Sequence, residues 1–153
     1  MASSCAESER CRSGPPWRWR MARDRFATRS DAQLRLRTGH AYLEVAELVL
    51  SDERSEMPGV AAGLAVLAGI AASDAICVSR LGSIYRGENH RDAVELLRVA
   101  TMDGKKLSTT FLKLIDVKDE AHYGLIIVAP RKARDAVRWA SILVRRAQEE
   151  LER

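Results

Sequence analysis

Residues 58–82 read PGVAAGLAVLAGIAASDAICVSRLG, and this stretch decides the fold. Its larger apolar residues recur at spacings close to the repeat of one face of an α-helix. Pro58 suits the first turn of a helix, and Gly82 is a typical stop at its end. Small residues fill many of the other positions, so the backbone of a neighbouring helix can approach closely. We therefore expect residues 58–81 to form the central helix.

Three more helices are predicted before residue 120. The first starts at Ser30, where Gln33 completes a capping-box pattern, and it ends near residues 50–52. A short helix begins after Asn89 as its N-cap, and Asp103 with Gly104 breaks it. The next helix follows over residues 105–119. These turn residues predict three separate helices that pack against the central helix.

The last helix is predicted to start at Pro130, after an extended connection over residues 125–128. Its apolar residues alternate between spacings of four and three, with Arg, Asp, Gln and Glu on the other face; they are Ala133, Val137, Ala140, Val144, Ala147 and Leu151. The predicted fold class is therefore all-α, an antiparallel four-helix bundle with an additional short helix, formed by residues 30–153.

The basic charge belongs to the N-terminal part of the chain. Residues 1–39 hold nine Arg against four acidic residues, whereas the rest holds sixteen basic and seventeen acidic residues. Residues 1–29 mix Arg, Ser, Gly and Pro without helical or alternating periodicity, so we predict a disordered basic tail. Met21 is an alternative start of translation. The net charge of +4 is therefore no evidence for a basic domain.

The three cysteines match neither a zinc site nor a disulfide framework, which favours a reduced, cytoplasmic protein. The longest apolar run, residues 60–72, is too short to span a bilayer. We therefore expect no membrane segment, no metal and no cofactor.

Residues 61–100, AAGLAVLAGIAASDAICVSRLGSIYRGENHRDAVELLRVA, resemble the middle of HEPN domains, where a small-residue helix leads through a polar turn to a His that opens the next helix. Residues 112–124, LKLIDVKDEAHYG, and 129–151, APRKARDAVRWASILVRRAQEEL, are similar to the closing half of that family. ASDAICVSRLG and RGENH are also similar to small actinobacterial proteins labelled DNA-binding or hypothetical. The resemblance implies a HEPN-like antiparallel bundle, frequently dimeric.

Catalytic HEPN members are metal-independent ribonucleases in which an Arg and a His are separated by four to six residues. The chemistry needs a group that handles the 2′-hydroxyl proton and a cation for the charge on phosphorus. The nearest pair here is Arg86 and His90, with three residues between them. Because this spacing is shorter than in the catalytic family members, we favour the interpretation that Arg86 is a solvated turn residue and that His90 lies in the first turn of a helix. The alternative is that the two residues are catalytic.

A second polar group at the end of the predicted fourth helix contains Lys118, His122 and Tyr123. Such a turn lies near the bundle groove in HEPN-like folds, so the resemblance implies ligand binding, for instance of phosphate or a nucleotide. The competing interpretation is that Lys118 offsets the negative end of the helix and Tyr123 packs its ring on the bundle. Asp74 in the central helix is expected to pair with Arg80 or another cation.

Three functional hypotheses stay open. The favoured one is a HEPN-like binding module that works as a homodimer or with another protein and contacts nucleic acid or a nucleotide. The second is a toxin-type ribonuclease that uses Arg86 and His90 across a dimer interface. The third is a structural interaction domain. The expected partners are a second copy, a nucleotidyltransferase as in toxin–antitoxin pairs, and RNA or DNA.

Overall fold

The computed structural model describes residues 24–85, 90–123 and 127–153, with residues 24, 25, 90 and 119–123 described through the backbone alone. Within these ranges the chain forms five helices and two short strands, so the predicted all-α class is confirmed. In chain order the elements are β1 (Asp24–Phe26), α2 (Arg29–Leu50), α3 (Met57–Leu81), β2 (Ser83–Tyr85), α4 (His90–Ala100), α5 (Gly104–Tyr123) and α6 (Pro130–Glu152).

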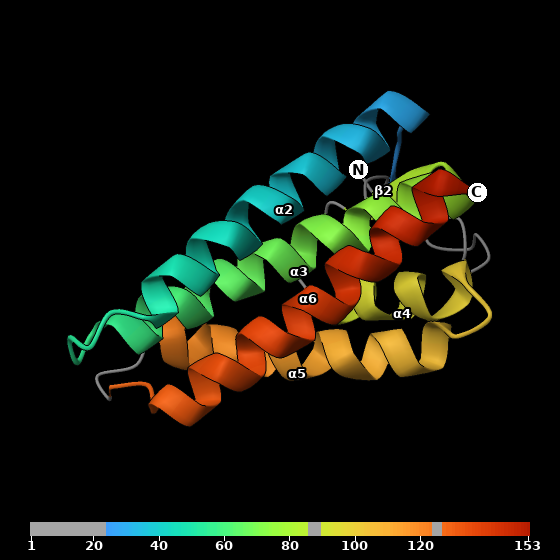
Figure 1. Ribbon diagram of the computed structural model, residues 1–153. Coiled ribbons are helices and arrows are strands. Elements are labelled where there is room, and N and C mark those ends of the chain that lie inside the picture. The colour runs from blue at the N-terminus through green and yellow to red at the C-terminus, as the bar shows by residue number, and fades with distance from the viewer. Residues whose placement is uncertain (1–23, 86–89, 124–126) are drawn as a thin grey trace, which may run out of the picture.

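Helix α3 is central, as predicted, because it contacts each of the other four helices. Figure 1 shows α3 and α6 side by side and pointing in the same direction, with α2 on one side of this pair and α5 on the other. Helices α2 and α5 run in the opposite direction, and the short α4 packs on α5 and α3.

Small residues of α3 bring its neighbours close. A Cβ atom at Gly39 of α2 would lie 3.4 Å from the carbonyl oxygen of Ala68 in α3, so the two backbones nearly touch there. A Cβ atom at Gly69 would lie against Leu114 of α5 and Leu143 of α6. Because both leucine side chains are fully buried, this glycine marks the point where three helices meet in the core.

The limits of α3 and α6 agree with the prediction. Pro58 occupies the first turn of α3, and Gly82 ends that helix with a left-handed φ of 65°. Pro130 starts α6, and every residue of its predicted apolar stripe is buried. Helix α5 continues to Tyr123, beyond the predicted end at residue 119. The predicted N-cap Asn89 lies outside the described residues.

The cap of α2 differs from the prediction. Thr28, not Ser30, is the N-cap, and Asp31, not Gln33, completes the capping box: the Thr28 backbone N–H donates to Asp31 at 2.7 Å, and the Asp31 N–H donates to the Thr28 hydroxyl at 3.3 Å. A carboxylate interacts with the positive end of a helix more favourably than an amide does. The capping box therefore has the predicted three-residue spacing but starts two residues earlier, at Thr28.

The two strands form a small antiparallel sheet that periodicity did not indicate. Phe26 pairs with Ser83 and Asp24 with Tyr85, while the N–H of Ala27 donates to the carbonyl of Gly82. Strand β1, the N-cap Thr28 and the first residue of α2 all lie in the segment 1–29 that was predicted to be disordered. Residues 1–23 of that segment lie outside the described residues. The sheet buries Ile84 and joins the start of α2 to the end of α3.

Gly104 makes the tight turn between α4 and α5, where the sequence predicted a helix break. A Cβ atom on Gly104 would lie 2.1 Å from the carbonyl oxygen of Arg98, a distance that no side chain tolerates. Only glycine allows the end of α4 to approach the start of α5 in this way.

Helix α3 is long enough to cross a membrane and contains an 18-residue segment that is apolar enough to do so by composition, with a mean hydropathy of 1.9. The surrounding helices bury 72% of that segment inside the fold. The apolar character of α3 is therefore accounted for by its central position in the helical core.

Candidate functional site

The structure places the sequence-predicted site residues on two different helices. His90 is the first residue of α4, and Lys118, His122 and Tyr123 lie in the last turns of α5. Arg86 lies outside the described residues, so the predicted catalytic pair is untested by geometry. Lys118 and His122 are four positions apart on one helix and therefore share a face.

Asp74 has a cationic partner, as expected, but the partner comes from α2. The Arg35 guanidinium lies 2.6 Å from the Asp74 carboxylate, and the Asp74 side chain is mostly buried. This ion pair ties α2 to the C-terminal half of α3. We assign it a structural role.

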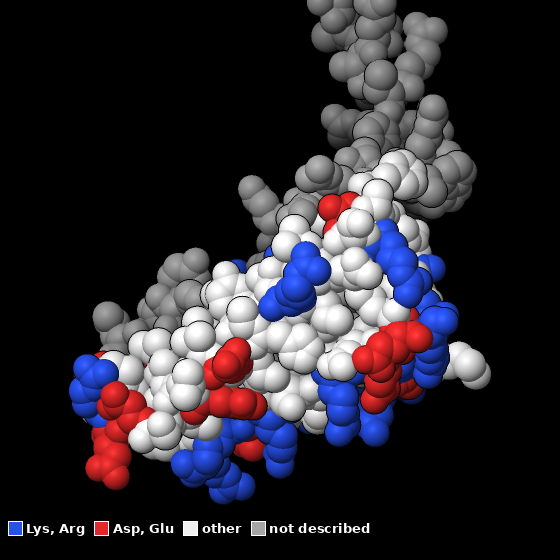
Figure 2. Space-filling view, turned by 45° about the horizontal axis from the view of Figure 1, so that its top comes forward, with Lys and Arg blue, Asp and Glu red and all other residues white. Residues whose placement is uncertain are grey.

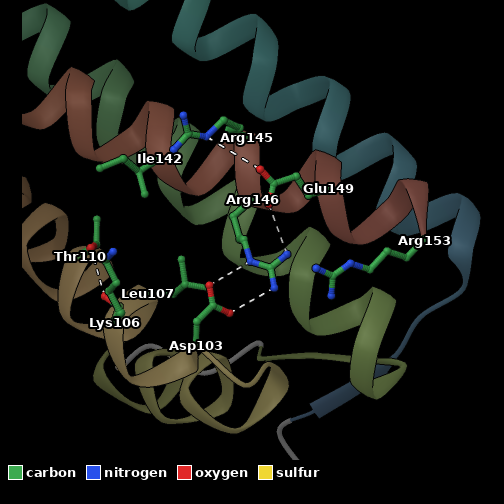
Figure 3. Close-up of a pocket in the computed structure, with 9 residues that line it drawn as sticks. All are labelled: Asp103, Lys106, Leu107, Thr110, Ile142, Arg145, Arg146, Glu149 and Arg153. Carbon is green, nitrogen blue, oxygen red and sulfur yellow. Dashed lines mark hydrogen bonds and ion pairs between the residues drawn. The ribbon is translucent and has the colours of Figure 1, made fainter.

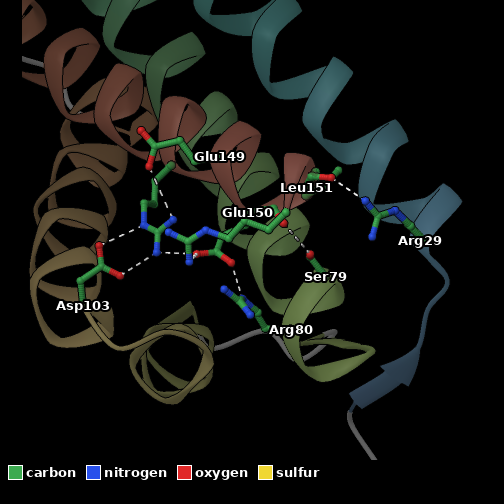
Figure 4. Close-up of polar contacts among 9 residues, drawn as sticks. Arg29, Ser79, Arg80, Asp103, Glu149, Glu150 and Leu151 are labelled. Carbon is green, nitrogen blue, oxygen red and sulfur yellow. Dashed lines mark hydrogen bonds and ion pairs between the residues drawn. The ribbon is translucent and has the colours of Figure 1, made fainter.

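Arg80 instead contacts Glu150, which lies at the centre of a polar cluster that sequence analysis missed. The Glu150 side chain is 0% exposed, although the helical pattern had put the glutamates of α6 on its outer face. Arg80 and Arg146 contact its carboxylate directly, and Arg153 lies 3.3 Å away (Figure 4). A buried carboxylate needs such partners because losing water is costly for an isolated charge. We call these four residues the Glu150 cluster.

Arg146 extends the Glu150 cluster to the turn between α4 and α5. Its Nε and Nη2 groups donate to the two carboxylate oxygens of Asp103 at 3.0 and 3.2 Å. These hydrogen bonds hold the pKa of Asp103 below its ordinary value and raise that of Arg146. The third nitrogen, Nη1, is buried without a hydrogen bond, 3.5 Å from the Glu149 carboxylate. Arg146 thus links α6 to the turn before α5 through paired charges.

The same region continues outward into a groove of about 350 Å³ between α5 and α6, which we call the α5–α6 groove. Figure 3 shows side chains of α5 on one wall and side chains of α6 on the other. Its lining consists of four basic, two acidic and three uncharged residues: Lys106, Arg145, Arg146, Arg153, Asp103, Glu149, Leu107, Thr110 and Ile142. The groove therefore carries an excess of positive charge.

A second hollow, of about 450 Å³, lies at the opposite end of the helices, beside the turn between α2 and α3. Arg54 in that turn donates to both carboxylate oxygens of Asp52 and lowers the pKa of Asp52 to about 2. The other lining charges, Glu53 and Arg134, have opposite signs. This hollow has no excess of either charge.

The outer surface of α2 and α3 exposes large apolar side chains. We call the following five residues the α2–α3 strip: Leu34, Val45, Leu48, Val60 and Leu67. Figure 2 shows mostly uncharged surface over α2, with Lys and Arg gathered along the edge away from it. Leu34, Val45 and Leu48 share one face of α2, and an exposed apolar helix face of this kind is typical of interaction sites.

Comparison with protein-family models finds no match for this chain, and comparison with curated proteins finds none either. The described residues nevertheless present two features suited to binding. One is the basic α5–α6 groove, and the other is the apolar α2–α3 strip.

Proposed function

We propose that this chain is a HEPN-like helical binding module that acts as a homodimer and contacts nucleic acid or a nucleotide. Its four long helices, α2, α3, α5 and α6, would form the HEPN-type antiparallel bundle, with α4 as the additional short helix. The alternating direction of these helices along the chain supports this assignment. Binding, rather than bond cleavage, is the proposed activity.

The observation that carries the proposal is the α2–α3 strip. Leu34, Val45 and Leu48 of α2 are each between 46% and 67% exposed, and Ala41 lies between them. Positions 34, 41 and 48 are seven residues apart, the repeat with which one helix packs along another. Covering this surface would remove several large apolar side chains from water, which favours association.

The charges beside the strip favour a second copy of the chain as the partner. Arg37 flanks the first half of the strip on α2, and Glu44 flanks the second half on the same side. In a two-fold dimer with antiparallel α2 helices, Arg37 of one copy would face Glu44 of the other, twice per interface. The surface is therefore complementary to itself in both apolar pattern and charge.

The test is the mass of the full chain in solution, measured by light scattering during size-exclusion chromatography. We expect a dimer for the wild type and a monomer for Leu48→Glu. Val99→Glu is the matched control, because Val99 on α4 is as exposed as Leu48, at 69% against 67%, but lies outside the strip. A monomeric wild type, or a dimer that survives Leu48→Glu, would overturn the proposal.

A charge exchange tests the pairing itself. Arg37→Glu and Glu44→Arg should each weaken the dimer because each would place like charges opposite one another. The double variant restores opposite charges and should recover the dimer. Failure of the double variant to recover would exclude this antiparallel arrangement.

A further inference from the structure

We infer that the α5–α6 groove binds a phosphate group of a nucleotide or of a nucleic acid chain, held by Lys106 and Arg145. This inference names the ligand of the proposed binding module and rests on that proposal. It concerns a different face of the molecule from the α2–α3 strip, so the two can fail separately.

Most charges around the groove already have partners. Arg146 forms ion pairs with Asp103, Glu149 and Glu150. The Glu150 carboxylate also forms ion pairs with Arg80 and Arg153. These contacts hold Arg146 in place, with only 13% of its side chain exposed. Three arginines, Arg80, Arg146 and Arg153, therefore face three acidic residues at the base of the groove, Asp103, Glu149 and Glu150, and these charges balance one another.

Two cations at the groove remain available. Within the described residues, the Lys106 ammonium group makes no ion pair or side-chain hydrogen bond, and Arg145 reaches Glu149 only at 4.0 Å. The Arg145 side chain is 76% exposed, so this contact restrains it little. Figure 3 shows Lys106 on the α5 wall and Arg145 on the α6 wall. A ligand between the walls would meet a cation on each side.

The balance of charge favours a phosphate. Four basic and two acidic side chains line the groove, and adding the neighbouring Arg80 and Glu150 leaves the same excess of two positive charges. A terminal phosphate carries nearly two negative charges at neutral pH and presents several acceptor oxygens. Lysine and arginine on opposite walls can donate to different oxygens of one such group.

The shape of the groove favours a phosphate attached to a larger body. A volume of about 350 Å³ exceeds the needs of a free ion and falls in the range of small-molecule sites. Leu107 and Ile142 supply apolar surface from the two walls, against which a sugar or a base can lie. A nucleotide, or one unit of a nucleic acid chain, combines these properties.

The experiment measures binding to the full chain of three probes: a fluorescent ATP analogue, a labelled single-stranded RNA oligonucleotide, and unlabelled inorganic phosphate as competitor. Lys106→Ala and Arg145→Ala should each weaken binding about fivefold, and the double variant by more than about tenfold. Lys105→Ala and Arg131→Ala are matched controls, because they remove the same charges from α5 and α6 at exposed positions outside the groove lining.

Each outcome has a defined meaning. Loss of ATP binding in the groove variants identifies a nucleotide site, and loss of RNA binding alone identifies a site for the nucleic acid backbone. No binding of either probe, or equal effects of groove and control variants, overturns the inference. Leu48→Glu should bind the probes like the wild type, so a failed dimer leaves the groove result interpretable.

Discussion

The carboxylate of Asp103, in the turn between α4 and α5, receives two hydrogen bonds from the Arg146 guanidinium of α6. This pair joins the turn before α5 to helix α6, between residues 43 positions apart in sequence, and adjoins the Glu150 cluster. It also orders the inner end of the α5–α6 groove. The stability of the fold and the shape of the proposed site are therefore linked through Arg146.

The first prediction concerns acid sensitivity. The pKa of Asp103 is lower in the folded chain than in the unfolded chain, where a value of about 3.9 is usual. Its stabilising contribution is thus present above pH 4 and is lost as the pH falls through the folded pKa. Asp103→Asn should lower the free energy of unfolding by about 1 kcal/mol or less at pH 7, since the side chain is 44% exposed.

Urea unfolding of the wild type and Asp103→Asn at a series of pH values checks this prediction. The difference between the two proteins should shrink as the pH is lowered below 4. A difference that stays constant down to the acid limit of folding would mean that the hydrogen bonds from Arg146 do not set the pKa of Asp103.

The second prediction concerns Glu150. Glu150→Gln keeps the shape of the side chain but removes the negative charge that three arginines contact. Removing one member of a buried ion pair leaves the others uncompensated, so we expect a loss of about 3 kcal/mol in the free energy of unfolding. Glu149→Gln, on the exposed side of the same helix, should cost less than about 1 kcal/mol. Equal effects would refute the central role of Glu150.

The course of α3 and α6 could be predicted from sequence because their signals are local. Pro58, Gly82 and Pro130 mark helix ends within a few residues, and the apolar spacing of α6 defines its buried face. The same spacing could have revealed Glu150, which lies three positions after Ala147 and seven after Leu143 on the buried face. Because Glu150 is charged, it was instead assigned to the outer face of α6.

Other features depend on residues that only the fold brings together. Arg80 and Glu150 are seventy positions apart, and strands β1 and β2 are separated by all of α2 and α3. Lys106 and Arg145 lie on different helices, and neither carries a local pattern that distinguishes it from other surface cations. The α5–α6 groove therefore had no signal in the sequence.

The third prediction compares two glycines. Gly104→Ala would place a methyl group against the Arg98 carbonyl, so one helix must shift, and we expect a loss of about 2 kcal/mol or more. A Cβ atom at Gly59 would meet Val128 at an ordinary 3.7 Å. Gly59→Ala should therefore be neutral or stabilising by about 0.5 kcal/mol, because alanine restricts the unfolded chain. Thermal unfolding of both variants measures the contrast.

The last prediction separates binding from ribonuclease activity. If the chain works by binding, the purified full-length protein should leave single-stranded RNA intact in EDTA, while it still binds the labelled oligonucleotide. The ribonuclease hypothesis instead requires cleavage in EDTA that is lost in His90→Ala and in Arg86→Ala, since general acid–base chemistry and charge stabilisation would come from those residues.

The groove variants discriminate further. Lys106→Ala should reduce oligonucleotide binding under both hypotheses. Under the ribonuclease hypothesis it should also reduce the rate of RNA cleavage, whereas under the binding hypothesis there is no cleavage to measure. Metal-independent cleavage that His90→Ala abolishes would replace the binding module with an enzyme, and the groove would then serve to hold its substrate.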